Sequence, residues 1–516
     1  MQLASIDIAI IIVYLIAIVL IGIFSSRKIH GEDELFLAGR SLGVYAVGLS
    51  LFASNISSTT LIGLAGDAYD SGIAVYNYEW MAAFILVIMA IFVFPYYIRS
   101  RVSTVPEYLE KRYNPFVRKY LSIVTIVLSI GVDTAGGIYA GALVLKAFFP
   151  DLIIWQVCIA LAVFAGLYTA FGGLRAVVYT DMVQSVVLLI GSSILTYLVF
   201  EKLDFSWDAI QSKMPEGHLS LFKPLDDKTL PWLGTLLGLP ILGFYYWSMN
   251  QYIVQRALGA RNLETAQKGA LFAGFLKLAP LFIMVLPGSM AYILLPDLPN
   301  KDLVFPTMII KYLPAGLTGL VLSGLLAAIM SSIDSSLNSA STLVTLDFIS
   351  AKKPGLNHQQ LGRIGRVVTL CFMALAAAWA PMIENFPGLF AYLQTAFSYI
   401  VPPLVAIFVL GYFSKKVHGR AAIAALLAGH GISAVCFVLV QSEIFYLHFT
   451  IMAFLLLAVT MVTQLVFSIF ISDQPAAGND FTFERAYINL SMKNKNIRIM
   501  IALLLAIMIL ILVVFK

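Results

Sequence analysis

Long uncharged apolar runs recur along the whole chain and leave one class of fold open. The sequence has 516 residues, of which 60% are hydrophobic and only 12% are charged. An ordinary soluble domain carries about 25% charged residues and has no use for this much apolar surface. A helix crosses the hydrocarbon layer of a bilayer with about 20 apolar residues. The sequence therefore predicts an all-α polytopic membrane protein with about 14 transmembrane helices.

The basic residues divide unequally between the loops on the two sides of these spans. Of the 33 Lys and Arg residues, 24 follow odd-numbered spans, 8 lie on the opposite side and Lys277 lies within a span. Cytoplasmic loops carry the excess of Lys and Arg, so we expect both termini outside a plasma membrane, the inner membrane of a bacterium. These loops account for the net charge of +5, so no nucleic-acid partner is expected. The spans are expected near residues 7–24, 43–66, 74–98, 120–145, 154–172, 182–200, 231–254, 269–294, 314–346, 367–383, 388–411, 421–441, 448–472 and 497–515.

Two charges stand alone in the middle of such runs. Glu79 is the only charge in residues 73–98, and Lys277 is the only one in residues 269–295. A charge at the centre of a helix costs roughly 2.5–3.5 kcal/mol on insertion scales, so it normally faces a partner or a watery cavity. This pattern indicates a binding site or pathway within the membrane. The alternative is a structural Glu–Lys pair that only holds helices together.

Two spans carry sequence that does not suit a continuous helix. The second span contains six polar residues in the eight from Ala53 to Thr60. The seventh contains Gly234, Gly238, Pro240 and Gly243, although small residues also serve helix packing. Non-helical backbone at membrane depth persists only where it is buried in protein or lines a cavity. Two interrupted spans that lie five spans apart are typical of an inverted-repeat secondary transporter.

The chain is therefore expected to form one transmembrane transporter domain over residues 1–516, because no linker separates parts of it. Spans 2–6 and 7–11 would be the two halves of a 5+5 inverted repeat over about 43–411. The helices near 7–24, 421–441, 448–472 and 497–515 would be peripheral to this core.

Short motifs in spans 2–11 resemble the sodium/solute symporter family, and within it the bacterial sodium–sugar cotransporters for glucose and galactose. The resemblance implies a LeuT-type core that works by alternating access. The motifs are Phe36-Leu37-Ala38-Gly39-Arg40, Ala53-Ser54-Asn55-Ile56-Ser57, Tyr78-Glu79-Trp80, Val105-Pro106-Glu107-Tyr108, Gly172-Gly173-Leu174-Arg175-Ala176-Val177-Val178-Tyr179-Thr180-Asp181, Tyr245-Tyr246-Trp247, Asn250-Gln251, Gln255-Arg256, Phe275-Leu276-Lys277-Leu278, Ser331-Ser332 and Leu337-Asn338-Ser339.

The resemblance implies a sugar site and an aromatic gate. Carboxylates, ammonium groups and amides suit such a site, because each sugar hydroxyl both donates and accepts hydrogen bonds. Thr60 stands where sugar symporters have Gln or His, Gly243 replaces Asn and Ala82 replaces Ser, so the particular sugar stays open. The residues expected to bind the substrate are Asn55, Thr60, Tyr78, Glu79, Lys277 and Gln394, and those expected to form the gate are Tyr246 and Trp247. Ordinary interfacial aromatics are the alternative for the gate pair.

The resemblance also implies a sodium site between the second and ninth spans. A hard cation takes oxygen ligands from carbonyl and hydroxyl groups. The expected ligands are the carbonyls of Ala53, Ile56 and Ala328 and the hydroxyls of Ser331 and Ser332. Serine pairs also serve helix packing, which is the alternative for the last two.

A second sodium site is a further hypothesis. Asp334 lies in a run that is otherwise uncharged, and Ser331, Asp334 and Ser335 share one helix face. Asp181, which matches an Asp of a second sodium site in some family members, would complete it. A hydrogen-bonded Asp334 within the helix bundle is the alternative.

These observations predict Na⁺-coupled uptake of a sugar or related polyol across the plasma membrane. Na⁺ symport of another small solute, such as inositol, sialic acid or a carboxylate, is the alternative. The sequence shows neither a paired nucleophile and base nor a metal cluster, so we do not expect an enzyme. Nor does it show charged rings or a selectivity filter, as a channel would. The expected partners are the solute, sodium ions and membrane lipid, with no obligate protein partner.

Overall fold

The computed structural model describes residues 3–26, 37–353, 355–386, 389–471 and 481–516. Within these ranges it describes the backbone alone at positions 19, 22–26, 58, 164, 166–173, 175, 327, 358 and 391. Phe36 of the first motif lies outside the described residues, and the side chain of Arg175 in the fifth motif is not described.

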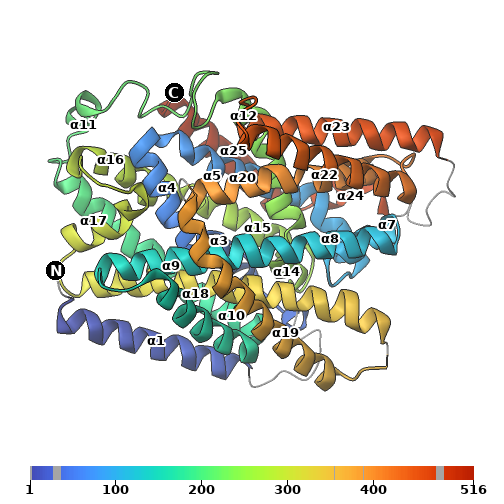
Figure 1. The fold of residues 1–516 in the computed structure, drawn as a ribbon, viewed down its shortest axis with the longest axis horizontal. Coiled ribbons are helices and arrows are strands. Elements are labelled where there is room, and N and C mark those ends of the chain that lie inside the picture. Colours follow the sequence, from blue (N-terminus) through green and yellow to red (C-terminus); the bar gives the residue numbers. More distant parts are fainter. Residues whose placement is uncertain (1–2, 27–36, 354, 387–388, 472–480) are drawn as a thin grey trace.

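The described chain is helical almost throughout, as predicted (Figure 1). The α-helices are α1 (Ser5–Ser26), α3 (Val44–Asn55), α4 (Ser58–Ser71), α5 (Asn77–Ile88), α6 (Phe94–Ser100), α7 (Val105–Arg112), α8 (Pro115–Leu128), α9 (Ala135–Phe148), α10 (Ile154–Glu201), α11 (Trp207–Lys213), α12 (Trp232–Leu237), α13 (Leu239–Phe244), α14 (Gln251–Leu258), α15 (Leu263–Leu276), α16 (Leu286–Leu294), α17 (Val304–Tyr312), α18 (Leu317–Leu343), α19 (His358–Trp379), α20 (Leu389–Ile400), α21 (Pro402–Phe413), α22 (Gly419–Gln441), α23 (Phe449–Phe470), α24 (Arg485–Ser491) and α25 (Lys495–Val514).

Short 3₁₀ and π segments connect or widen these helices. The 3₁₀ segments are η1 (Ala38–Arg40), η2 (Ile73–Tyr76), η7 (Lys301–Leu303) and η9 (Ala380–Asn385). The π segments are η3 (Met89–Val93), η4 (Ser129–Thr134), η5 (Tyr245–Met249), η6 (Leu281–Val285) and η8 (Val344–Ser350). Single π turns inside helices are frequent at functional sites.

Fewer helices among the described residues qualify as membrane spans than the 14 that were predicted. Among the described residues, nine helices are long and apolar enough to cross a membrane, or eleven when each of two bent pairs is counted as one span. The remaining three predicted segments coincide with two shorter apolar helices, Ser5–Ile18 and Ile154–Val163, and with the run α12 to α14, which is divided into short pieces. The count of 14 therefore stays a prediction.

α10 is one unbroken helix in its hydrogen bonding, but it cannot be straight. Leu161 and Ile329 both lie within 3 Å of the Cβ position of Gly141, and Asp181 bonds Ser331. Leu161 and Asp181 are twenty residues apart, which corresponds to about 30 Å in a straight helix. Their neighbours Ile329 and Ser331 are only two residues apart on α18, which corresponds to about 3 Å. The two arms of α10 therefore both lie beside the middle of α18, as expected for two consecutive spans of opposite direction.

The second span is broken where its polar run predicted. α3 and α4 meet at an angle of 55° after Asn55. The N–H of Ser57 donates to the Asn55 carbonyl, and the N–H of Thr60 donates to the Ser57 hydroxyl. In a continuous helix these two N–H groups would serve the carbonyls of Ala53 and Ile56. The break thus withdraws the helical donors from both of those carbonyls.

The seventh span is interrupted at two places, one predicted and one not. The expected break covered Gly234 to Gly243, and α12 ends and α13 begins on either side of Gly238. The backbone becomes extended only at Asn250, with φ −70° and ψ 118°. Gly238 also serves close packing, because a Cβ on it would lie 2.2 Å from the Thr450 carbonyl of α23.

α20 and α21 meet at a third bend, of 47°. Side chains of α22 form hydrogen bonds with the backbone carbonyls at this bend. Pro402 and Pro403 have no N–H groups, so backbone carbonyls in the turn before them lose their helical donors. The Ser433 hydroxyl donates to the Tyr399 carbonyl, and His430 Nε2 lies 2.9 Å from the Ile400 carbonyl. A helix outside the expected core thus stabilises a bend within it, where no water is available to do so.

One face of the protein gathers both described ends of the chain. Near the N-terminus, Asp7 accepts hydrogen bonds of 2.7 Å from the N–H groups of Gly316 and Gly319. At the other end, the Leu221 N–H donates to the Phe515 carbonyl over 2.9 Å. The loop around residues 202–230 therefore lies on the same face as the termini, which we call the terminal face.

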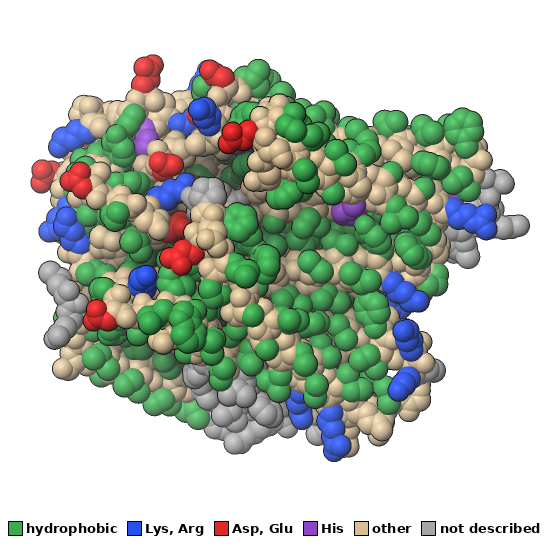
Figure 2. Space-filling model, viewed as in Figure 1, with side chains coloured by type: hydrophobic (Ala, Val, Ile, Leu, Met, Phe, Trp, Pro, Cys, Tyr) green, Lys and Arg blue, Asp and Glu red, His purple; other side chains and the backbone are tan. Residues whose placement is uncertain are grey.

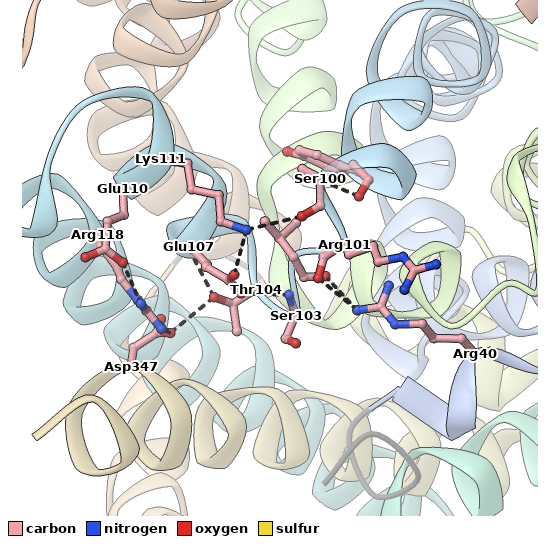
Figure 3. Close-up of polar contacts among 12 residues, drawn as sticks. Arg40, Ser100, Arg101, Ser103, Thr104, Glu107, Glu110, Lys111, Arg118 and Asp347 are labelled. Carbon is pink, nitrogen blue, oxygen red and sulfur yellow. Dashed lines mark hydrogen bonds and ion pairs between the residues drawn. The ribbon is translucent and has the colours of Figure 1, made fainter. Parts of the chain in front are cut away.

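The opposite face carries the loops that the sequence analysis found rich in Lys and Arg, and we call it the basic face. In Figure 2 a broad hydrophobic band separates two ends of the molecule. One end shows both acidic and basic side chains, whereas the charged side chains visible at the other end are all Lys or Arg. Figure 3 shows how this face is held together. Asp347 of η8, which is buried, accepts from Arg118 of α8 at 2.6 Å and from Thr104, the residue before α7, at 3.1 Å. Arg40 reaches the backbone carbonyl of Arg101 at 3.1 Å.

Candidate functional site

A cavity of about 110 Å³ lies in the middle of the helix bundle, beside the break in the second span. Its walls come from the α3–α4 junction, α5, η4, α13 with η5, α14, α18 and α20. Seven of the eight residues predicted to bind the substrate or to form the gate line it: Asn55, Thr60, Tyr78, Glu79, Tyr246, Trp247 and Gln394. The structure therefore brings together side chains that are up to 339 positions apart, from Asn55 to Gln394.

Lys277 is the eighth residue, and it lies directly behind the cavity wall. Its Nζ donates to Glu79 Oε2 at 2.5 Å, and its side chain is fully buried. The ammonium also lies 5.5 Å from the centre of the Trp247 ring and 5.8 Å from that of Phe52. The predicted Glu–Lys pair is thus present, with Glu79 between the lysine and the cavity. A solute carboxylate that bound Lys277 would have to displace Glu79.

The polar side chains on the cavity wall differ in whether they already have hydrogen-bond partners within the protein. Thr60 Oγ1 donates to the Asn55 carbonyl at 2.7 Å, so this hydroxyl helps to hold the helix break. Asn55 Oδ1 is buried and has no hydrogen-bond partner among the described residues. A buried amide oxygen without a partner costs about 1–3 kcal/mol, which a hydroxyl donor from a bound solute would recover.

Aromatic side chains close the remaining sides of the cavity. The Tyr246 and Tyr252 hydroxyls lie 2.5 Å apart, and the Tyr246 and Trp247 ring centres are 5.4 Å apart. Tyr78 packs edge-on against Phe390 of α20 at 5.0 Å. Tyr246 and Trp247 lie in the π segment η5, just before the break at Asn250. Trp247 is only 2% exposed, so it is not an interfacial anchor.

A second, smaller cavity of about 10 Å³ contains three of the five predicted sodium ligands. Ala53, Ile56 and Ala328 line it, with Gln184 and Ser185 of α10. This volume admits about one water-sized particle. The carbonyls of Ala53 and Ile56 are those whose helical donors are withdrawn at the break. The residues present therefore suit a small hard cation, which prefers oxygen ligands.

The two predicted serine ligands have other partners in this structure. Ser332 borders the larger cavity and donates to the Ala328 carbonyl at 2.9 Å, so it joins the two cavities. The Ser331 hydroxyl donates to Asp181 Oδ1. Ser332 thus lies next to the other ligands, whereas Ser331 is directed toward the predicted second site.

That second group of residues surrounds a buried arginine. Asp181 Oδ2 accepts from Ser50 at 2.6 Å and from Arg256 at 3.0 Å. Arg256 also donates to Ser335 at 2.7 Å. Asp334 is 2% exposed on the same helix as Ser335. Asp181, Ser331 and Ser335 therefore come together as predicted, but a guanidinium that the sequence analysis did not assign already neutralises Asp181.

Two residues on the cavity walls were missed from the sequence. Asp133 of η4 lines the larger cavity and is the only charge in residues 120–145, which is the same signal that identified Glu79. Gln184 lines the smaller cavity, and its Oε1 has no partner among the described residues. The only signal for Gln184 in the sequence is that it is a polar residue inside a span. The nearby charge of Asp181 is a stronger signal of the same kind.

The two faces are built differently. A third cavity, of about 1010 Å³, lies at the terminal face, bordered by Tyr69, Tyr139, Lys301, Asp302 and Leu389. On the basic face the bonds of Asp347, Arg118 and Thr104 tie the ends of three elements together (Figure 3).

The Glu79–Lys277 pair generates a test of stability. Glu79→Gln leaves a buried ammonium without its carboxylate, and removing one partner of a buried pair costs about 3–5 kcal/mol. Lys277→Met should cost a similar amount, and the double variant should lose much less than the sum. Thermal unfolding of the purified protein in detergent measures all three. The pair Glu264–Lys268, joined at 2.6 Å but partly exposed, is the matched control. Its single variants should lose about 1 kcal/mol or less. Equally mild losses for both pairs would contradict a strongly coupled buried pair.

Comparison with known proteins gives a family. A profile of the sodium:solute symporter family matches residues 35–431. The sodium/glucose cotransporter of Vibrio parahaemolyticus is 35% identical over 457 residues, which cover 83% of this chain and 84% of that protein. Sodium/glucose cotransporter 1 of Oryctolagus cuniculus is 34% identical over 466 residues, which cover 82% of this chain and 70% of that protein. A sodium/mannose cotransporter of Bos taurus is 34% identical over 510 residues, which cover 88% and 85%.

Solved structures agree on the fold. A Na⁺-coupled sialic acid symporter in a substrate-bound outward-open state superposes with a TM-score of 0.79 at 21% identity, covering 91% of this chain and 98% of that one. Mhp1, a nucleobase-cation-symport-1 family transporter, gives a TM-score of 0.55 at 16% identity, covering 87% and 98%. These likenesses show a LeuT-type fold, and the matches in sequence show that this multi-pass membrane protein belongs to the sodium:solute symporter family.

Proposed function

We propose that the protein couples the entry of Na⁺ to the uptake of a sugar or related polyol by alternating access. One observation carries this proposal: a cavity lined by polar and aromatic side chains and a second cavity about the size of one water molecule adjoin the same helix break. Movement at this break would change both cavities together, which is what coupling requires. The names of the relatives, which are sodium/glucose and sodium/mannose cotransporters, support the same solute class.

In this proposal the larger cavity binds the sugar. The Asn55 and Gln394 amides, the Tyr78 hydroxyl and the Glu79 carboxylate offer donors and acceptors to a ring of hydroxyls. Lys277 holds Glu79 in place through its hydrogen bond, and Thr60 holds the turn at Asn55. Tyr246 and Trp247 form the inner gate, because they line the cavity from η5, just before the break at Asn250.

The smaller cavity binds the sodium ion that is transported. Ala53, Ile56 and Ala328 supply backbone carbonyls, and Ser331 and Ser332 supply hydroxyls once these turn from their present acceptors. Gln184 adds an amide oxygen on the same cavity. Oxygen ligands of this kind suit a hard monovalent ion.

The proposed function also implies how the helices are arranged and oriented in the membrane. The transport core would extend over about 43–411 as two inverted halves, with α1, α22, α23 and α25 around it in lipid. The excess of Lys and Arg puts the basic face in the cytoplasm and both termini outside the plasma membrane. The alternative solutes, inositol, sialic acid or a carboxylate, remain distinct outcomes of the transport test.

Counterflow in proteoliposomes tests the function. Vesicles loaded with unlabelled glucose or mannose should accumulate the labelled sugar transiently when Na⁺ is present, and should not when choline replaces it. Accumulation of neither sugar, with counterflow of sialic acid or another carboxylate instead, would replace the sugar proposal by its alternative.

Ser332 provides a test of the sodium site. Ser332→Ala removes one oxygen from the proposed set, so the Na⁺ concentration for half-maximal uptake should rise about tenfold, while thermal stability changes by about 1 kcal/mol or less. Ser323→Ala is the matched control, because Ser323 is a buried serine of the same helix that also donates to the carbonyl four residues earlier. An unchanged Na⁺ dependence in Ser332→Ala would make Ser332 merely structural.

The second sodium site predicts the number of charges moved. We propose that Asp181, Ser331, Asp334 and Ser335 bind a second Na⁺, with Arg256 shifting away from Asp181 as the ion enters. Reversal potentials in proteoliposomes should then give two charges per neutral sugar, and one in Asp334→Asn. One Na⁺ that enters down a membrane potential of about 100 mV and a tenfold concentration gradient supplies roughly 3.7 kcal/mol, enough for an approximately 500-fold sugar gradient. A ratio of one in the unchanged protein would remove the second site.

A further inference from the structure

Asp133 is a charge on the solute cavity to which no role has yet been given. It lies in η4, in the middle of the fourth span, and its side chain borders the same cavity as Glu79 and Gln394. An ionisable residue at this depth is costly to insert, so it is normally retained for a function. Its neighbour Thr134 is fixed by a 2.7 Å contact with Ser336 of α18, which anchors η4 beside the cavity.

The charges around the cavity balance except at Asp133. Lys277 is paired with Glu79 at 2.5 Å, and Arg256 is paired with Asp181 at 3.0 Å. Asp133 forms no ion pair among the described residues, and its Oδ2 is buried without a hydrogen-bond partner there. The side-chain amide of Asn250 reaches its carboxylate. Lys277 and Arg256 are therefore already neutralised, and an ionised Asp133 is a charge on the cavity wall that no cation among the described residues pairs.

We propose that Asp133 is a specificity-determining residue that admits neutral polyhydroxy solutes to this cavity and excludes solutes bearing a carboxylate. The inference rests on the proposed function and narrows its solute class. A sugar hydroxyl can donate to the unpartnered Oδ2, whereas an ionised carboxylate has only acceptors to offer and brings a like charge. Lys277 does not compensate such an anion, because Glu79 already holds it.

The size of the effect follows from Coulomb's law. Two like charges about 7 Å apart at an effective dielectric constant of about 20 repel enough to change affinity roughly 50-fold. Water that enters with the solute weakens this repulsion. We therefore expect a hexuronate to bind at least about tenfold more weakly than the hexose with the same ring.

The first experiment uses the unchanged protein at about pH 8.5, where Asp133 is compared in its ionised form. Glucose with glucuronate, and galactose with galacturonate, are compared as inhibitors of Na⁺-dependent uptake and as stabilisers of the purified protein against thermal unfolding in Na⁺. Each uronate should require at least tenfold more ligand than its parent hexose. Equal potency of a hexose and its uronate overturns the inference.

The second experiment changes the charge. Asp133→Asn should reduce the hexose-to-uronate ratio at least fivefold, mainly by improving binding of the uronate, while Asp133→Glu should keep it. Asp226→Asn, which removes an acid from the exposed loop after α10, is the matched control and should also keep the ratio. An unchanged ratio in Asp133→Asn overturns the inference.

The outcomes separate the inference from the function on which it rests. If Asp133→Asn does not insert into the membrane, the pH dependence of the ratio in the unchanged protein decides instead: the ratio should fall at least fivefold from about pH 8.5 to about pH 5.5, as Asp133 is protonated while the uronate stays ionised, and a constant ratio overturns the inference. Absence of Na⁺-dependent hexose uptake defeats the proposed function. The ligand-induced thermal shifts then still report whether the cavity distinguishes a hexose from its uronate, since they do not require transport.

Discussion

The break after Asn55 is the constraint on which the rest of this structure depends. Inside a bilayer a backbone carbonyl without a donor costs several kcal/mol, because no water replaces the lost hydrogen bond. Here the N–H groups of Ser57 and Thr60 turn to local acceptors, and Ala53 and Ile56, whose carbonyls lose these donors, border a cavity the size of one water molecule. The same turn places Asn55 and Thr60 on the wall of the solute cavity. An ion and a solute can therefore act on one bistable element, which is the physical basis of coupling.

At the other departures from regular helix, neighbouring helices supply the missing hydrogen-bond donors or close packing. The bend before Pro402 receives donors from α22, and the close contact of α12 and α13 with α23 depends on Gly234 and Gly238. Buried charges are likewise matched: Lys277 with Glu79, Arg256 with Asp181, and Asp347 with Arg118. A mostly neutralised interior is what a low dielectric demands, and it makes the one unmatched acid on the cavity, Asp133, chemically informative.

Much of the fold could be predicted because the bilayer imposes simple rules on sequence. Apolar runs of about 20 residues mark helices, and six polar residues in a row of eight cannot remain helical unless they serve a cavity. The break at Asn55 followed from that rule. The extended break at Asn250 in the seventh span did not, because the glycine-rich stretch before it, which interrupts the helix at Gly238, carried the stronger signal. Asn250, the residue that is actually extended, carries no strong local signal. The bend between α20 and α21 was also missed, although Pro402 and Pro403 mark it.

The sequence by itself determined that this is a helical membrane protein, where its charges must be paired or functional, and which family motifs it contains, since insertion energy depends on local composition. Only the tertiary structure decided which charges pair. Lys277 and Glu79 are 198 positions apart, and Arg256 had no assigned partner until Asp181, Ser50 and Ser335 were seen around it. It also decided that Asp133 faces the solute cavity, because contacts between distant helices follow from packing, and no local pattern encodes which face of a span meets which neighbour.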